Sequence, residues 1–137
     1  MKQLSTLLVA LFLPLFALAQ SWDEAMYKQI EQSIRMPQFA DREYSITQFG
    51  ASPKASAAKN QKAINRAILM CSKKGGGRVV VPRGEWLTGA IRMQSHVNLV
   101  VEEGATLKFA FEPELYPLVK TSWEGIGCWN YSPCIYA

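Results

Sequence analysis

The sequence RVVVPRGEWLTG at residues 78–89 and the sequence NLVVEEGATLKF at residues 98–109 repeat one pattern. Aligned position for position, the two stretches share identical residues at Val80/Val100, Val81/Val101, Gly84/Gly104 and Leu87/Leu107. A repeat of this length is typical of a β-solenoid, in which short parallel strands stack turn upon turn and share one core. The repeat therefore predicts two turns of a coil, and we expect the chain to be the opening portion of a longer protein.

Short apolar runs separated by glycines predict the individual strands of this coil. They lie at residues 79–81, 86–88, 90–93, 97–101 and 106–109. Near-continuous apolar runs suit parallel strands whose inner side is buried. The region from Arg78 to Ala137 is therefore expected to be all-β, with the aromatic stretch after Pro113 as a loop excursion.

Two amphipathic helices are expected before the coil. The first begins at a capping box formed by Ser21 and Glu24, carries apolar residues at every fourth position, and ends at Pro37. A short strand around Tyr44, Ile46 and Phe49 and a loop over residues 51–59 follow it.

The second helix is expected to cap the coil. Its apolar face consists of Ala63, Ile64, Ala67, Ile68 and Cys71, and the glycine run at residues 75–77 ends it. An amphipathic helix laid over the first turn of a solenoid covers an otherwise exposed core. The predicted organisation is therefore a helix and first strand at 20–50, a loop and capping helix at 51–77, and the first turns at 78–137.

Residues 1–19 have the features of a cleaved signal peptide. Lys2 precedes an apolar run over residues 7–18, and Ala17-Leu18-Ala19 is a small-x-small cleavage site that leaves Gln20 as the new N-terminus. The rival interpretation, a retained membrane anchor, needs about 20 apolar residues, and this run is shorter and contains Pro14. We expect a secreted or periplasmic protein that has no membrane contact after cleavage.

The net charge restricts the classes of partner that the sequence supports. The formal net charge of +4 falls by one when Lys2 is removed, and the basic residues are spread along the chain, which gives nucleic-acid binding no support. A mild basic surplus is compatible with an acidic polysaccharide as partner.

The three cysteines can form at most one disulfide, and Cys128 with Cys134 is the expected pair. Cys71 is expected in the core. Three free thiols are the alternative.

Five segments taken together resemble a known family. They are YSITQFGA from Tyr44, KAINRAI from Lys62, GGGRVVVPRGEWLTGAI from Gly75, VNLVVEEGATLKF from Val97 and WEGIGCWNYSPCIYA from Trp123. In this order they resemble the N-terminal portion of the polygalacturonases, glycoside hydrolase family 28. The resemblance implies a right-handed parallel β-helix that hydrolyses α-1,4-galacturonosyl bonds of pectin with inversion. It also implies pectin or oligogalacturonides as partner, no cofactor, and a monomer at full length.

The chain departs from the family pattern in two places. Residues 52–58 replace a turn that is rich in glycine and aspartate in family members. None of the family's Asn-x-Asp, Asp-Asp, Gly-His-Gly and Arg-x-Lys motifs occurs, and no aspartate follows Asp41. Glutamates next to turns and the lone His96 are expected to be solvated. We therefore expect no catalytic residue and no activity from this chain alone, with a non-catalytic polysaccharide-binding or fibre-forming solenoid as the alternative function.

The aromatic segment near the end contains the candidate binding residues. Trp123, Trp129 and Tyr131 offer ring faces for a pyranose, and Lys120 offers a cation for a uronate carboxylate. The favoured alternative is that these rings pack against the strands and anchor the loop. No metal site is expected, because Asp23 and Asp41 both precede the coil and His96 has no partner ligand nearby in the sequence.

Overall fold

A computed structural model describes residues 24–137, and the chain divides between Gln38 and Phe39 into two units. In the first unit, residues 24–33 form a helix whose apolar side chains Met26, Tyr27 and Ile30 are exposed. The helix ends four residues before Pro37. The predicted signal peptide and the Ser21 end of the capping box lie outside the described residues. Within residues 24–137, no helix has the length and apolar character needed to cross a membrane.

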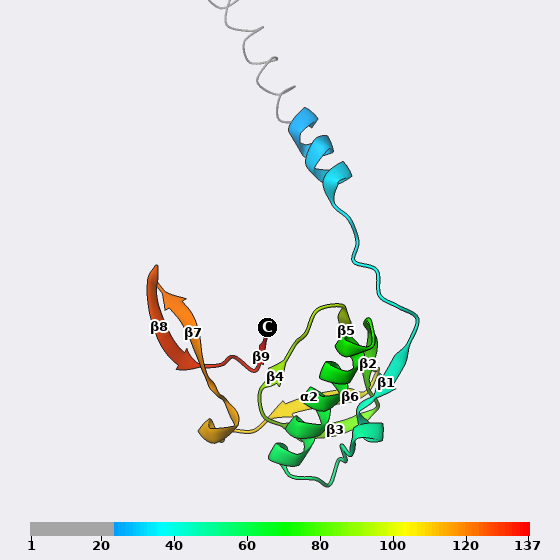
Figure 1. The fold of residues 1–137 in the computed structure, drawn as a ribbon, viewed down its shortest axis with the longest axis vertical. Helices are drawn as coiled ribbons and strands as arrows, with labels where there is room; N and C mark the ends of the chain where they lie inside the picture. Colours follow the sequence, from blue (N-terminus) through cyan, green and yellow to red (C-terminus); the bar gives the residue numbers. More distant parts are fainter. Residues whose placement is uncertain (1–23) are drawn as a thin grey trace, which may run out of the picture. The chain divides into compact units, whose positions relative to one another are not determined.

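The second unit, from Phe39 onward, is built on strands that pair in parallel (Figure 1). One sheet has the order β1-β2-β5, a second pairs β3 with β6, and a third pairs β4 with β9. These strands are β1 (Glu43–Ser45), β2 (Gly77–Val81), β3 (Gly84–Thr88), β4 (Ile91–Arg92), β5 (Val97–Val101), β6 (Ala105–Phe109) and β9 (Ile135–Tyr136). The five strands predicted from the apolar runs are confirmed, and corresponding strands of the two repeats are partners.

The register of the second sheet differs from the sequence alignment by one residue. In the first sheet Val80 pairs with Val100, as the repeat predicts, whereas in the second sheet Leu107 pairs with Trp86 and not with Leu87. Two residues join β2 to β3 and three join β5 to β6, so the longer turn shifts the later strand. Because alternate residues of a strand face opposite sides, Trp86 and its partner Leu107 face the core, where Trp86 is 2% exposed, while Leu87, opposite Lys108, is only partly buried.

The amphipathic helix is confirmed as α2 (Ala57–Lys73), which packs against the strands of all three sheets. It buries the expected apolar face, including Cys71. The helix starts two residues before the end of the predicted loop, because the Ser56 side chain accepts a hydrogen bond from the Lys59 N–H and caps it. Gly76 follows the helix with φ 89°, and a Cβ there would lie 2.4 Å from the His96 carbonyl oxygen.

One segment before α2 corrects the sequence interpretation, and the segment after it is held by a buried amide of α2. The predicted strand around Tyr44 is shorter, since residues from Ile46 form the 3-10 helix η1 (Ile46–Phe49). The segment that replaces the family's glycine-rich turn is fixed by Asn60, which is fully buried. The Asn60 amide accepts from the Ser52 N–H at 2.9 Å and donates to the carbonyls of Ser52 and Leu87.

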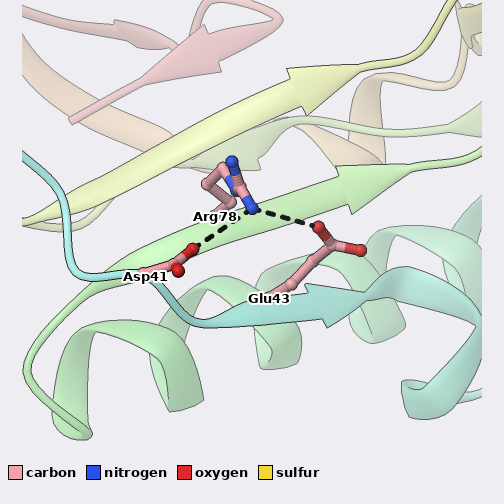
Figure 2. Close-up of polar contacts among 3 residues, drawn as sticks. All are labelled: Asp41, Glu43 and Arg78. Carbon is pink, nitrogen blue, oxygen red and sulfur yellow. Dashed lines mark hydrogen bonds and ion pairs between the residues drawn. The ribbon is translucent and has the colours of Figure 1, made fainter.

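An exposed ion-pair cluster joins the first two strands of the first sheet (Figure 2). Arg78 on β2 lies 3.5 Å from the Asp41 carboxylate and 3.6 Å from the Glu43 carboxylate. Glu43 and Arg78 are also direct partners in the sheet register. Such exposed pairs stabilise a fold by about 1 kcal/mol or less each. Both carboxylates therefore have a structural partner.

The aromatic stretch predicted as a loop forms an antiparallel hairpin instead. After the 3-10 helix η2 (Pro113–Leu115), β7 (Leu118–Trp123) pairs with β8 (Ile126–Tyr131), and Figure 1 shows the pair projecting from the parallel strands. Glu124 and Gly125 form the turn, both with positive φ, as a tight two-residue hairpin turn of type I′ requires. The hairpin lies between the second and third sheets in chain order, and β9 then returns to pair with β4.

Candidate functional site

The hairpin places Lys120 and Trp129 side by side. The two residues are directly opposite one another in the β7–β8 register, and opposite residues of an antiparallel pair share one face. Leu118 and Tyr131 are the next such pair on the same face. Trp129 is 70% exposed and Tyr131 is 57% exposed, so these rings do not pack into the core. The face therefore presents a cation and two aromatic rings to solvent.

A pocket of about 480 Å³ opens beside this face. Lys120 and Trp129 line it together with Arg92 from β4 and Tyr136 from β9, which are partners in the third sheet. None of the side chains that line the pocket carries a carboxylate, and neither Arg92 nor Lys120 makes an ion pair within residues 24–137. The pocket thus presents two cations and two aromatic side chains, and its one carboxyl group is the α-carboxyl of Ala137, the last residue of the sequence, which also lines it.

Backbone and side-chain hydrogen bonds fix the wall that carries Arg92. The Ile91 N–H donates to the Cys134 carbonyl at 2.8 Å, and the Met93 N–H donates to the Tyr136 carbonyl at 2.6 Å. From the other side, the Asn65 amide oxygen on α2 accepts from the Arg92 N–H at 2.8 Å. The Arg92 backbone is therefore held by α2 while its neighbours are held by β9.

A second amide on α2 joins the two walls of the pocket. The Gln61 Nε2 donates to the Ala90 carbonyl at 3.1 Å and to the Leu115 carbonyl at 2.6 Å. Ala90 precedes β4, and Leu115 precedes the hairpin. Gly89 leaves room for this contact, since a Cβ there would lie 2.6 Å from the Leu115 Cβ and 2.9 Å from the Gln61 amide. The same helix therefore positions both the Arg92 strand and the base of the hairpin.

The structure does not bring all four predicted binding residues together. Lys120 and Trp129 share the pocket, whereas Trp123 faces the opposite side of the hairpin, where Ile126 is its partner. Tyr131 shares the face of Trp129 but lines a different hollow. The sequence interpretation missed Arg92 and Tyr136. Their only signal was a charged residue beside the buried Ile91 in a short strand, and their proximity depends on the pairing of β4 with β9.

All three cysteines are free thiols in the structure. Cys71 is buried in the core, as predicted, and burial raises the pKa of its thiol. The expected Cys128–Cys134 bridge is not formed. Cys128 lies within β8 opposite Thr121, while Cys134 lies beyond the end of the hairpin next to β4.

The remaining titratable candidates are exposed and separate. Glu85 pairs with Lys108 at 3.3 Å, Glu102 and Glu103 occupy the turn after β5, and Glu124 occupies the hairpin turn. His96 is exposed in a turn with φ 64°, and its carbonyl accepts the Gly77 N–H. Residues 24–137 contain no cluster of three or more His, Cys, Asp or Glu side chains suited to a metal ion.

Comparison with known proteins connects this geometry to a family. The chain is 40% identical to the hyperthermoactive exopolygalacturonase from Thermotoga maritima, with a TM-score of 0.73 over 82% of this chain and 25% of that chain. It is 28% identical to the family 28 exopolygalacturonase from Yersinia enterocolitica, with a TM-score of 0.61 over 70% of this chain and 16% of that chain. The chain resembles the polygalacturonases.

A curated sequence gives the same resemblance. The chain is 34% identical over 64 residues to a "Probable polygalacturonase" from Vitis vinifera. The aligned region covers 44% of this chain and 13% of that protein. No family model matches the chain. The chain thus spans about a quarter or less of the length of these polygalacturonases, and the resemblance concerns that part of them.

Proposed function

We propose that this chain is the N-terminal part of an exported, polygalacturonase-like glycoside hydrolase that acts on pectic polysaccharide. The reaction we assign to the whole protein is the hydrolysis of α-1,4-galacturonosyl bonds with inversion. The resemblance to two exopolygalacturonases supports this assignment, and the small share of their length that the chain spans supports its status as one part. We expect the full-length protein to be a monomer.

In this proposal the second unit forms the first turns of a right-handed parallel β-helix, with α2 covering its N-terminal end. The parallel pairing of corresponding strands in three separate sheets supports such a coil. The burial of the α2 apolar face against those strands supports the capping role. The hairpin then interrupts the second turn before β9 completes it.

The pocket beside the hairpin is the observation that carries the proposal. A galacturonate unit has a carboxylate and an apolar CH face, and it needs both a cation and a ring. Arg92 and Lys120 supply the cations, and the guanidinium of Arg92 can hold a carboxylate with two parallel hydrogen bonds. The exposed Trp129 ring supplies a stacking surface next to Lys120. The pocket is therefore suited to an acidic sugar.

The chain contributes binding but not the chemical step. Inversion needs one carboxylic acid to protonate the leaving oxygen and a second carboxylate to activate water, at a separation of roughly 6.5–9.5 Å. No acidic side chain lines the pocket, and the glutamates after Arg78 are all exposed, with Glu85 in an ion pair to Lys108. We therefore expect residues 20–137 to bind acidic oligosaccharide without cleaving it.

A non-catalytic β-solenoid that binds polysaccharide is the second candidate function. The observation in its favour is the same pocket, which has cations and rings but no pair of acids. The two candidates make the same prediction for this chain and differ for any longer protein that contains it. Asn-x-Asp, Asp-Asp and Gly-His-Gly motifs in the sequence encoded after Ala137 favour the hydrolase, and their absence favours the binding protein.

Two measurements on residues 20–137 test the proposal. The protein is passed over immobilised polygalacturonate and over an immobilised neutral galactan, and reducing ends are assayed after incubation with soluble polygalacturonate. We expect retention on the acidic polymer alone and no release of reducing ends. Failure to be retained contradicts the sugar-binding role, and turnover contradicts the assignment of the catalytic acids to other parts of the protein.

Export is a separate part of the proposal. We infer that the signal peptide is cleaved between Ala19 and Gln20, so that the protein is secreted or periplasmic. The intact mass of protein recovered from the periplasm or the medium should correspond to a chain that begins at Gln20. A chain that retains Met1 contradicts this.

A further inference from the structure

A second hollow, of about 390 Å³, lies on the other side of the segment that follows the hairpin. Residues 110–113 and Tyr116 form one wall, and Tyr131, Ser132 and Cys134 form the other. Small-molecule sites in proteins have volumes of roughly 300–1,000 Å³, so the hollow has room for a sugar unit. The residues that line the cationic pocket alternate with these along the chain, since Trp129, Pro133 and Tyr136 line the first pocket.

Hydrogen bonds hold both walls of this hollow in place. The Tyr116 hydroxyl donates to the Ala110 carbonyl at 2.7 Å, and the Ser132 N–H donates to the Pro117 carbonyl at 2.9 Å. Burial, and then the neighbouring Cys134, raise the pKa of the Tyr116 phenol, which keeps this hydroxyl a neutral donor. The hollow is thus formed before any ligand enters.

Two aromatic rings and one buried hydroxyl without a hydrogen-bond partner line the hollow. Phe111 is fully exposed and Tyr131 is 57% exposed, so two aromatic side chains at the hollow are accessible. Ser132 is 5% exposed, and its hydroxyl has no hydrogen-bond partner among residues 24–137. A buried hydroxyl without a partner favours a ligand that can hydrogen-bond with it.

The charge of this hollow is opposite to that of the first pocket. Glu112 is the one charged side chain that lines it, and no arginine, lysine or histidine does. A galacturonate carboxylate placed there meets the like charge of the exposed Glu112 and no cation, which is unfavourable. An uncharged pyranose has CH faces for the rings and oxygens for the hydroxyl.

We propose that the Phe111/Tyr131 hollow binds an uncharged pyranose unit, and that on a pectic chain this is a galacturonate whose carboxylate is methyl-esterified. The inference rests on the proposed function, because that function supplies the polymer. The cationic pocket then binds an ionised galacturonate unit of the pectic chain, and this hollow binds an esterified one. Trp129 and Tyr131 lie on one face of β8, but Trp129 lines the cationic pocket and Tyr131 lines this hollow.

Calorimetric titration of residues 20–137 tests the proposal with three trisaccharides: trigalacturonate, its fully methyl-esterified form and neutral galactotriose. The variants are Phe111→Ala and Ser132→Ala, with Trp123→Ala as the matched control. Trp123 is a 70% exposed aromatic residue of the hairpin that lines neither hollow. Phe111 is fully exposed and Ser132 is unpaired, so we expect no fall in the thermal midpoint for either variant.

We expect Phe111→Ala to raise the Kd for the esterified trisaccharide about threefold to tenfold, and Ser132→Ala to raise it in the same direction. Both variants should leave the Kd for trigalacturonate within twofold of wild type, and Trp123→Ala should change neither. Galactotriose binding that depends on Phe111 also supports the proposal, since it is an uncharged pyranose. The proposal is overturned if the esterified trisaccharide does not bind, or if Phe111→Ala leaves its Kd unchanged. Failure of the polygalacturonate retention test leaves this comparison intact, so the two proposals fail separately.

Discussion

Arg92 and Lys120 set the charge of the pocket beside the hairpin. Arg92 comes from β4 and Lys120 from β7, and neither side chain forms an ion pair within residues 24–137. A hydrogen bond to a charged group contributes about 1.5–3 kcal/mol, against about 0.5–1.5 kcal/mol for a neutral one. Both residues are exposed, so their loss is expected to affect binding and not folding.

The first prediction follows from these two charges. Arg92→Gln and Lys120→Gln should each raise the Kd for trigalacturonate about tenfold, with the thermal midpoint unchanged. Lys62→Gln removes an exposed lysine of α2 that lines neither pocket, and it is the control. Calorimetry at low and at physiological salt measures the effect, which should shrink as salt rises. Equal affinities for all four proteins contradict the assignment.

The thiol of Cys71 gives the second prediction. Because burial raises its pKa in the folded state, the thiol binds its proton more tightly when folded than when unfolded. This contribution to stability is fully present below the unfolded thiol pKa and is lost as the pH rises through the folded pKa. Cys71→Ala should therefore lose less of its free energy of unfolding than wild type between pH 8 and pH 10.

Thiol labelling at neutral pH checks the same assignment independently. Cys134 is exposed, Cys128 is half-buried and Cys71 is fully buried. We expect a thiol reagent to modify Cys134 first, Cys128 more slowly and Cys71 only on unfolding. Two unreactive thiols that become reactive after reduction indicate instead that Cys128 and Cys134 form the bridge considered from the sequence.

Register matters most at the scale of the strands. Trp86 and Leu87 are adjacent, but only Trp86 faces the core, on the same side as its β6 partner Leu107. Trp86→Ala should lower the free energy of unfolding by about 3–5 kcal/mol, as buried aromatic truncations do. Leu87→Ala should lower it by less than about 1.5 kcal/mol, because that side chain is only partly buried. Denaturant unfolding measures both, and a larger loss at Leu87 supports the alignment of Leu87 with Leu107.

The fourth prediction concerns Asn65, a positioning residue that acts through the Arg92 backbone. Asn65→Ala removes the acceptor for the Arg92 N–H and should raise the Kd for trigalacturonate about threefold. Asn65→Asp keeps the acceptor for the Arg92 N–H but removes the Nδ2 donor to the Ala90 carbonyl, so it should restore most of the affinity even though its thermal midpoint falls. A merely structural role predicts that the thermal midpoint falls in both variants and that affinity follows it.

The strands and α2 could be predicted from the sequence because their signals are local. Apolar runs between glycines mark β2 to β6, and one apolar face followed by a glycine run marks α2. The register of β6 could not, because it depends on whether two or three residues make the turn. The hairpin was also missed, since its strands are exposed on both faces and lack the alternation that burial imposes.

At the scale of the whole molecule, the cationic pocket forms because the chain returns from the hairpin to the parallel strands. β9 pairs with β4 only after the hairpin has left the parallel strands, and this pairing brings Arg92 to Tyr136 and to the hairpin base. The sequence could indicate Lys120 and Trp129, which lie in one segment with aromatic residues. It could not indicate Arg92, because no local pattern connects that residue with a segment so much later in the chain.

The central claim is that the pocket lined by Arg92, Lys120 and Trp129 binds an acidic sugar. A crystal structure of residues 20–137 with trigalacturonate tests it most directly. We expect one galacturonate carboxylate within hydrogen-bond distance of the Arg92 guanidinium and the Lys120 ammonium, with a sugar face on the Trp129 ring. A trisaccharide bound elsewhere on the chain, or a pocket that stays empty at millimolar ligand, would contradict the account.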